Sequence, residues 1–313
     1  MPKCRPCSRL LLFATTNRPI ICGRFTPEPG DGVTKSVKND NFRARYGSWA
    51  VIAGGSEGIG AEFAGQLAAL GLNLLLVARR KDLLENFAQD LAKRYLVEVR
   101  TAILDLSSRS DVETLTELSS GLDVGLLVCN SALSPIGRYL EVPMDLHLQL
   151  LDLNCRMPAM LSRAIGEQMV DRRRGGIIFV SSMGSFQGAE LVAHYAASKA
   201  YLRVLAEGMW TELRPWGVDV IASCAGPVRT PTYLQDRPRH PRWLAVPEME
   251  CEPVVRQTLR ALGHRPVVIP GMVNRISTWF VSRFLSKRTA IALTSAGTRA
   301  IYPQFASWPR RRR

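Results

Sequence analysis

A tyrosine and a lysine four residues apart are the side chains of this sequence best placed to do chemistry. Tyr195 and Lys199 are the first and last residues of the pentapeptide Tyr-Ala-Ala-Ser-Lys, at the start of a segment with helical periodicity. Ser182 lies thirteen residues before Tyr195, directly after a strand-like segment. Positions i and i+4 of a helix lie on one face, so the phenol and the ammonium are neighbours. A nearby cation favours phenolate, and Lys199 is therefore expected to lower the pKa of Tyr195. Such a phenol can exchange a proton with an oxygen that changes between carbonyl and alcohol.

Short apolar segments alternate with helical segments from residue 49 onward, and this alternation must position the reactive side chains. The predicted strands cover residues 49–53, 73–77, 97–104, 124–129, 177–181, 218–224 and 267–269, and the predicted helices cover 58–70, 81–94, 108–120, 144–170 and 194–214. The pattern predicts an α/β fold, a Rossmann-like, doubly wound parallel sheet in a single domain over residues 48–270. Ligands of such sheets bind beyond the carboxyl ends of the strands, where the motifs of this chain fall.

A glycine-rich turn follows the first predicted strand and opens the first predicted helix. Gly54, Gly58 and Gly60 allow a tight turn and let a pyrophosphate approach the backbone at the helix N-terminus. Ser56 and Ile59 lie in the same turn and are included in the predicted cofactor site. The alternative is a purely structural turn.

The end of the second predicted strand indicates which dinucleotide binds. Sheets that bind NAD commonly place an acid here to hold the ribose 2′-hydroxyl. This chain has Arg79 and Arg80 instead, and a guanidinium suits the 2′-phosphate of NADP(H). The alternative is a solvated pair of arginines at a helix start. We predict NADP(H), with Arg79 at the phosphate.

Together these motifs resemble the short-chain dehydrogenase/reductase family over about residues 48–270. The glycines match that family's Thr-Gly-x-x-x-Gly-x-Gly, with Ala53 in place of the threonine. Asp105 and Leu106 resemble the pair that contacts the adenine after the third strand. Asn130 and Ser131 stand where the family has Asn-Asn-Ala-Gly, a departure that removes no catalytic group. The segment 225–230 resembles the Pro-Gly-x-Val-x-Thr nicotinamide clamp with its proline displaced, which adds Val228 to the cofactor site.

The resemblance extends to the family's catalytic tetrad, which Asn154, Ser182, Tyr195 and Lys199 match. It implies hydride transfer between a nicotinamide and a carbonyl or alcohol carbon, with Tyr195 as the proton donor and Ser182 bonded to the substrate oxygen. Lys199 would hold the nicotinamide ribose as well as tune Tyr195, and Asn154 would anchor a water that relays protons to Lys199.

The branch that this chain resembles includes 3-oxoacyl and steroid reductases, so the expected substrate is an apolar ketone or secondary alcohol. The resemblance also implies a homodimer or homotetramer packed through helices 144–170 and 194–214. Two alternatives stay open, namely a non-catalytic dinucleotide sensor and a basic membrane-surface scaffold. A sensor usually shows a degenerate tetrad, whereas this chain fills all four positions. The scaffold is distinguished by whether turnover survives removal of the basic tails.

The net charge of +14 lies at the two ends of the chain. Residues 1–47 carry +6 and residues 253–313 carry +12 with no acid, which leaves −4 for the middle. A dedicated nucleic-acid module would carry its basic stripe on the folded domain, so no nucleic-acid partner is expected. The seven cysteines show no spacing typical of a disulfide framework. Cys4 and Cys7 have zinc-ligand spacing without a second pair of ligands nearby, so no metal site is expected. Apolar surroundings at Cys129 and Cys224 favour a reducing, cytoplasmic setting.

Both ends of the chain differ in character from the predicted domain. Residues 1–47 have the composition of a disordered basic extension, although a targeting segment or a mis-assigned start would look the same. Residues 271–313 form a basic C-terminal segment in which apolar residues recur at helical spacing between Met272 and Leu285. That helix is expected either to dock on the domain or a neighbouring subunit, or to attach peripherally to an anionic membrane.

Overall fold

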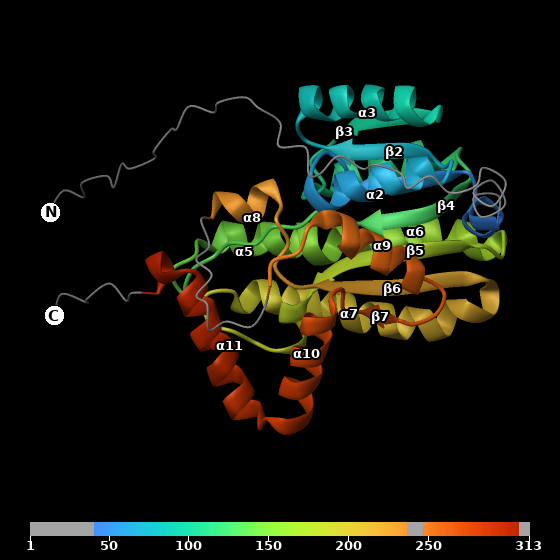
Figure 1. Ribbon diagram of the computed structural model, residues 1–313. Helices are drawn as coiled ribbons and strands as arrows, with labels where there is room; N and C mark the ends of the chain where they lie inside the picture. Colours follow the sequence, from blue (N-terminus) through green and yellow to red (C-terminus); the bar gives the residue numbers. More distant parts are fainter. Residues whose placement is uncertain (1–40, 237–246, 307–313) are drawn as a thin grey trace, which may run out of the picture.

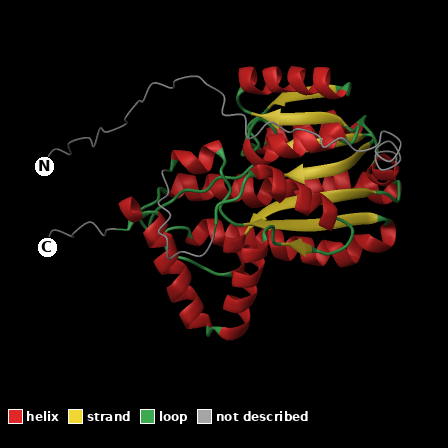
Figure 2. Ribbon diagram, viewed as in Figure 1, coloured by secondary structure: helices red, strands yellow, loops and turns green. Residues whose placement is uncertain are grey.

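A seven-stranded parallel sheet forms the centre of the molecule (Figures 1 and 2). The computed structural model of the chain describes residues 41–236 and 247–306. The strand order is β3-β2-β1-β4-β5-β6-β7. The chain therefore adds strands outward from β1 to β3 on one side, and then from β4 to β7 on the other. The strands are β1 (Trp49–Ala53), β2 (Asn73–Ala78), β3 (Val99–Ile103), β4 (Val124–Cys129), β5 (Gly175–Ser182), β6 (Val218–Ala225) and β7 (Val267–Val268). The predicted fold class is confirmed.

Helices cover both faces of the sheet, because alternate residues of each strand point to opposite sides. On β1, Val51 belongs to one buried cluster and Ile52 to the other. One face packs against α4 (Arg109–Ser120), α6 (Met157–Asp171) and α7 (Ala193–Leu213). The other packs against α2 (Gly58–Ala69), α3 (Lys81–Tyr95) and α9 (Cys251–Ala261). Strands buried on both faces explain why the sequence shows continuous apolar runs instead of alternation.

The long helix predicted over residues 144–170 is interrupted. It consists of α5 (Met144–Leu151), a π-helical turn (Asp152–Arg156) and then α6. Single π-helical turns inside helices are frequent at functional sites. Here the turn carries Asn154, which is completely buried. The widened turn therefore presents this asparagine to the interior of the protein.

The segment before β1 is part of the folded unit. Residues 41–46 are helical, and the Tyr46 hydroxyl donates a 2.8 Å hydrogen bond to the buried carboxylate of Asp219 on β6. Arg45 pairs with the same carboxylate at 2.6 Å. Burial, followed by the charge of Asp219, raises the pKa of Tyr46. The ordered domain thus includes residues that the sequence analysis assigns to the extension, whereas residues 1–40 lie outside the described part of the chain.

Two helices after β7 leave the body of the domain and return to it. α10 (Met272–Phe284) and α11 (Lys287–Ile301) form a V-shaped hairpin, and α11 brings the chain back toward α5 and α8 (Pro231–Gln235) (Figure 1). The apolar stripe predicted around residues 272–285 is confirmed as one helix, while α8, α9 and α11 were not predicted. No helix in the described ranges is long and apolar enough to span a bilayer.

We expect Tyr46→Phe to lower the free energy of unfolding by about 1–3 kcal/mol, because it removes a donor from a buried carboxylate. The measurement is chemical denaturation followed by circular dichroism. Tyr95→Phe, at the end of α3, is the matched control and should change the stability by less than about 0.5 kcal/mol. Equal stabilities of the two variants would show that the Tyr46–Asp219 bond does not anchor the segment.

Candidate active site

Three side chains of the predicted tetrad meet where β5 ends and α7 begins. Ser182 is the last residue of β5, and Tyr195 and Lys199 lie on the first turns of α7. A hydrogen bond joins the side chains of Ser182 and Tyr195, and the Lys199 ammonium lies 5.6 Å from the centre of the Tyr195 ring. The predicted juxtaposition of hydroxyl, phenol and ammonium is therefore present in the structure.

Asn154 lies beside these groups, but its hydrogen bonds go mainly to the backbone. Its Oδ1 accepts from the Leu133 amide at 2.8 Å, and its Nδ2 donates to the Leu133 carbonyl at 2.9 Å. Nδ2 also donates to the Ser198 hydroxyl at 3.0 Å, next to Lys199. Asn154 thus fixes the loop after β4 against the start of α7.

Lys199 is almost completely buried. The residue is only 2% exposed, and its ammonium donates a 2.8 Å hydrogen bond to the Val180 carbonyl on β5. Burial lowers the pKa of Lys199 to about 8, against the opposing influence of the thiols of Cys155, Cys224 and Cys129. Lys199 is therefore charged at neutral pH but loses its proton at a pH only slightly above neutral.

The pKa of Tyr195 differs from the sequence-based expectation. Burial raises it, and the hydrogen bond with Ser182 only partly opposes that effect. The lowered pKa expected for Tyr195 is therefore not found. The physical reason is desolvation, since removing the phenol from water penalises its anion. In this state the tyrosine is a protonated donor at neutral pH.

The glycine-rich turn packs so closely that side chains would not fit. A Cβ on Gly60 would lie 1.8 Å from the Gly54 carbonyl oxygen, and one on Gly54 would lie 2.6 Å from the Ser131 hydroxyl. Gly54 and Gly58 also have φ of +86° and +58°, which favour glycine. The side-chain amide of Asn130 donates to the Gly54 carbonyl at 2.8 Å. The structure thus brings Asn130 and Ser131 to the turn, as predicted.

The turn also contacts the segment after β6. A Cβ on Gly58 would lie 2.9 Å from the side chain of Thr230, two residues beyond Val228. Val228 is buried and pairs with Met249 through a parallel bridge. Ser56 and Ile59 lie in the turn itself and at the start of α2. The predicted cofactor residues from β1, β4 and β6 therefore line one edge of the sheet.

Arg79 lies next to the predicted adenine site. Burial tends to raise the pKa of Asp105, but hydrogen bonds from Ser107 and the charge of Arg79 outweigh it and hold that pKa below its usual value. Leu106 is buried in the core beside it. Arg80 pairs with Glu57 at 2.6 Å, whereas Arg79 is exposed at the strand end. Of the two arginines, Arg79 is the one directed to the Asp105 side of the cleft.

Sequence reasoning missed several residues that surround Tyr195. His147 and His194 share a 2.7 Å Nδ1–Nδ1 hydrogen bond, and the Tyr139 ring lies 4.6 Å from His147 between ring centres. Tyr302, after α11, lies near Tyr195, since burial and then the charges of Asp236 and Tyr195 raise the pKa of Tyr302 to about 12. Nothing local in the sequence indicated that His194 has a histidine partner or that residue 302 returns toward Tyr195.

Comparisons with known proteins agree with this geometry. The family model described as short chain dehydrogenase matches residues 48–240. A 7beta-hydroxysteroid dehydrogenase from Clostridium sardiniense is 34% identical over 236 residues, 75% of this chain and 90% of that protein. A very-long-chain 3-oxoacyl-CoA reductase from Phaeosphaeria nodorum is 32% identical over 268 residues, 79% of this chain and 74% of that protein.

Solved structures are also similar to this chain. One, from a study of 7beta-hydroxysteroid dehydrogenase stereoselectivity, superposes with a TM-score of 0.76 at 28% identity and covers 80% of this chain and 98% of its own. A short-chain dehydrogenase from Sphingobium yanoikuyae in complex with NADPH has a TM-score of 0.66 at 27% identity, covering 75% of this chain and 93% of its own.

Proposed function

Because the chain belongs to the short-chain dehydrogenase family, we propose that it is an NADP(H)-dependent oxidoreductase that interconverts an apolar ketone and a secondary alcohol. The observation that carries the proposal is the meeting of Ser182, Tyr195 and Lys199 beside the glycine turn, at the carboxyl edge of the sheet. The names of the relatives favour a steroid-like or 3-oxoacyl substrate.

The residues present fit a dinucleotide. Gly54 and Gly60 pack so closely against the neighbouring backbone, Asn130 and Ser131 that only glycine fits, which keeps the turn tight at the N-terminus of α2, where an anionic pyrophosphate is stabilised. The turn residues Gly54, Ser56, Gly58, Ile59 and Gly60 would hold the pyrophosphate. The remaining cofactor contacts would come from Arg79 at the 2′-phosphate, Asp105 and Leu106 at the adenine, and Asn130, Ser131, Val228, Tyr195 and Lys199 toward the nicotinamide. When bound, the nicotinamide supplies the hydride.

The chain's own residues would manage the proton. Tyr195, protonated at neutral pH, would donate its proton to the substrate oxygen during reduction, and Ser182 would hydrogen-bond that oxygen as its charge develops. Lys199 would stabilise the phenolate that remains. Asn154 would hold the loop after β4 against the start of α7. It would also anchor a water that returns protons to Lys199. A non-catalytic sensor would not need all four of these groups, and the chain retains them.

Tyr195→Phe should reduce turnover by roughly a hundredfold to ten-thousandfold, because it removes the proton donor without altering the ring. The measurement is loss of NADPH absorbance with a panel of steroid ketones and 3-oxoacyl thioesters. Tyr201→Phe, further along α7, is the matched control and should keep wild-type turnover. Undiminished activity of Tyr195→Phe would reject this tyrosine as the donor.

Tyr195→Phe also distinguishes a pH effect caused by Lys199 from one caused by Tyr195. Lys199 has a lowered pKa of about 8, so its cation is present below that pH and is lost as the pH rises through it. NADPH affinity, measured by fluorescence, should therefore weaken above about pH 8 in both the wild type and Tyr195→Phe. A pH dependence that disappears with the phenol would assign the ionisation to Tyr195.

Arg79→Ala should weaken NADPH binding by roughly tenfold to a hundredfold and NADH binding by less than about threefold, because only NADPH has the 2′-phosphate. Dissociation constants for both cofactors provide the test. Arg80→Ala is the matched control, since Arg80 is already paired with Glu57. Equal losses for the two cofactors would contradict the assignment of Arg79.

We also propose peripheral membrane contact through α10. Its apolar face is exposed at Met272, Ile276, Trp279 and Phe284. Arg275, Arg283, Lys287 and Arg288 lie on or next to this helix, and the sequence from residue 253 onward has no acid to oppose them. Each such cation near an anionic surface contributes about 1 kcal/mol, and the apolar face adds to this.

In co-sedimentation, the full chain should pellet with anionic vesicles and much less with neutral ones. Trp279→Ser should reduce the bound fraction several-fold, whereas Leu118→Ser, which changes an exposed apolar residue on α4, should leave it unchanged. Failure of the wild type to bind anionic vesicles at low salt would leave α10 as a surface for another protein.

Association of copies through α5–α6 and α7 stays a prediction from the family resemblance. Exposed apolar side chains on these helices support it, among them Met144 and Leu148 on α5 and Tyr201 and Val204 on α7. The proposed assembly is a homodimer or homotetramer.

A further inference from the structure

Tyr195 lies in the first turn of α7, and this turn receives little support from its own helix. Among the described residues, no side chain caps the N-terminus of α7, so its first backbone amides depend on other partners. Leu191, just before the helix, has a φ of +68°, a conformation that an L-residue rarely adopts. The entry to α7 therefore needs contacts from neighbouring elements to keep its course.

Two hydrogen bonds tie this entry to the elements beside it. The Gly137 amide, in the loop after β4, donates to the Leu191 carbonyl at 2.9 Å. On α5, His147 shares the 2.7 Å Nδ1–Nδ1 bond with His194, which directly precedes Tyr195. Consecutive residues of a helix point about 100° apart, so this bond holds the turn while the phenol of Tyr195 points elsewhere.

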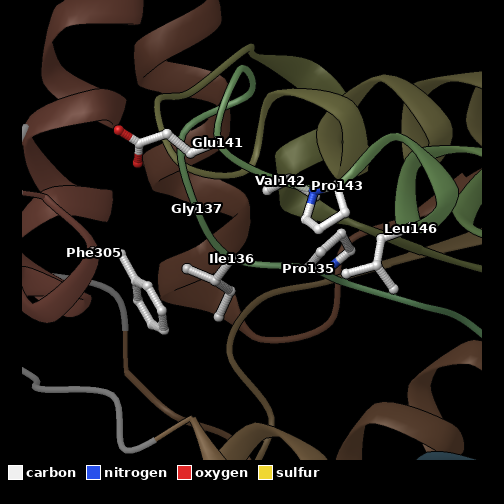
Figure 3. Close-up of a pocket in the computed structure, with 8 residues that line it drawn as sticks. All are labelled: Pro135, Ile136, Gly137, Glu141, Val142, Pro143, Leu146 and Phe305. Carbon is white, nitrogen blue, oxygen red and sulfur yellow. The ribbon is translucent and has the colours of Figure 1, made fainter. Parts of the chain in front are cut away.

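His147 is placed to act as a fixed support. It is only 4% exposed, and the Tyr139 ring lies over the pair, with its centre 4.6 Å from that of His147 and 6.0 Å from that of His194. Pro143 restricts the backbone where α5 begins and lies beside Leu146, the residue before His147 (Figure 3). The pair therefore joins the start of α7 to a buried and restrained part of the protein.

The hydrogen bonds assign the proton positions in the pair. A carbonyl oxygen only accepts, so His147 donates through Nε2 to the Tyr139 carbonyl at 3.0 Å. In the neutral ring its Nδ1 is then the acceptor, and His194 donates through its own Nδ1. A first added proton can enter at Nε2 of His194 and leaves this bond intact. A second can enter only at Nδ1 of His147, where it places two N–H groups and two positive charges face to face.

We propose that His147 and His194 form a pH-sensitive clamp that positions Tyr195 for proton transfer. The neutral or singly protonated pair holds the first turn of α7 against α5, and the doubly protonated pair releases it. Both histidines are positioning residues, since they act through the helix turn. The proposal rests on the proposed reductase function and adds a control of that function by acidity.

The surroundings of the pair disfavour the protonated rings. The charged and titratable groups of the neighbouring segments are Arg138 and Glu141 in the loop, Asp145 on α5, Glu190 before α7 and Tyr302 after α11. Within the described part of the chain, neither histidine forms an ion pair with a carboxylate, and Glu190 pairs with Arg138 instead. Burial and then the charge of His147 lower the pKa of His194. The clamp is therefore fully present above about pH 6.5, the ordinary pKa of histidine, and is lost as the pH falls below it.

A loss of ketone reduction in acid would report the clamp and not the proton donor. Tyr195 has a raised pKa and Lys199 has one of about 8, so both groups keep their protons throughout the acidic range. Asp236 is the other group to consider, because burial raises the pKa of its carboxyl. Variants of the histidines distinguish these two sources.

The test measures kcat for ketone reduction by NADPH, and the wild-type value should fall several-fold from about pH 7 to about pH 5. His147→Asn offers an acceptor that does not titrate, so it should keep kcat within about threefold of wild type at neutral pH and show no fall in acid. His147→Leu removes the acceptor and should give, already at neutral pH, the low kcat that the wild type reaches in acid. His264→Asn, which changes an exposed histidine before β7, is the matched control and should follow the wild type.

A fall in acid that persists in His147→Asn would overturn the proposal and assign the effect to another group such as Asp236. A wild-type kcat that stays constant in acid would overturn it as well. Equal melting temperatures at neutral pH establish that the variants are folded.

If the wild type reduces no ketone, the proposed function fails instead, and hydrogen exchange still decides on the clamp. Relative to intrinsic rates, peptides covering residues 191–199 should exchange faster below about pH 6 in the wild type but not in His147→Asn. Identical exchange of the two proteins across this pH range would refute the clamp.

Discussion

A lysine ammonium with almost no access to water is the feature on which the candidate site depends. Placing a cation in such a position is unfavourable unless hydrogen bonds compensate, and the Val180 carbonyl supplies one at 2.8 Å. The remaining penalty is expressed in the pKa, which falls to about 8. Desolvation also raises the pKa of Tyr195, so both groups are displaced toward their neutral forms. The phenol therefore keeps its proton at neutral pH, as the proposed role of proton donor requires.

The position of Lys199 requires the whole parallel sheet. Val180 belongs to β5, and the parallel register of β4, β5 and β6 brings Cys129, Ser182 and Ala225 to the same edge. The glycine turn reaches that edge from β1 and contacts Ser131 and Thr230 from the neighbouring loops. A shift of any of these strands would separate Ser182 and Lys199 from the glycine turn, because β1 leads into the turn whereas β5 carries Ser182 and the carbonyl that holds Lys199.

Local patterns in the sequence predicted the central fold closely. The bounds of β1 and β4 agree residue for residue, since these strands are continuous apolar runs between turn residues, and the glycine turn was located by its spacing. What depends on tertiary contacts was not predicted. The π-helical turn at Asn154 has the same amphipathic pattern as the helix around it, and Tyr302 comes near Asp236 and Tyr195, which are distant in the sequence. The pKa of Tyr195 was misjudged because spacing reveals a neighbouring charge but not the loss of water.

The last long helix, α11, is held to the domain by polar contacts around Glu190. Its buried residues Ala290, Ser295 and Gly297 are small, which lets the helix lie close to the segment before α7. The Ser295 hydroxyl accepts from the Glu190 amide at 3.1 Å. The Glu190 carboxylate pairs with Arg299 on α11 and with Arg138 in the loop after β4. One carboxylate therefore joins the C-terminal hairpin to two loops at the carboxyl edge of the sheet, so the position of α11 depends on the same edge that carries the candidate site.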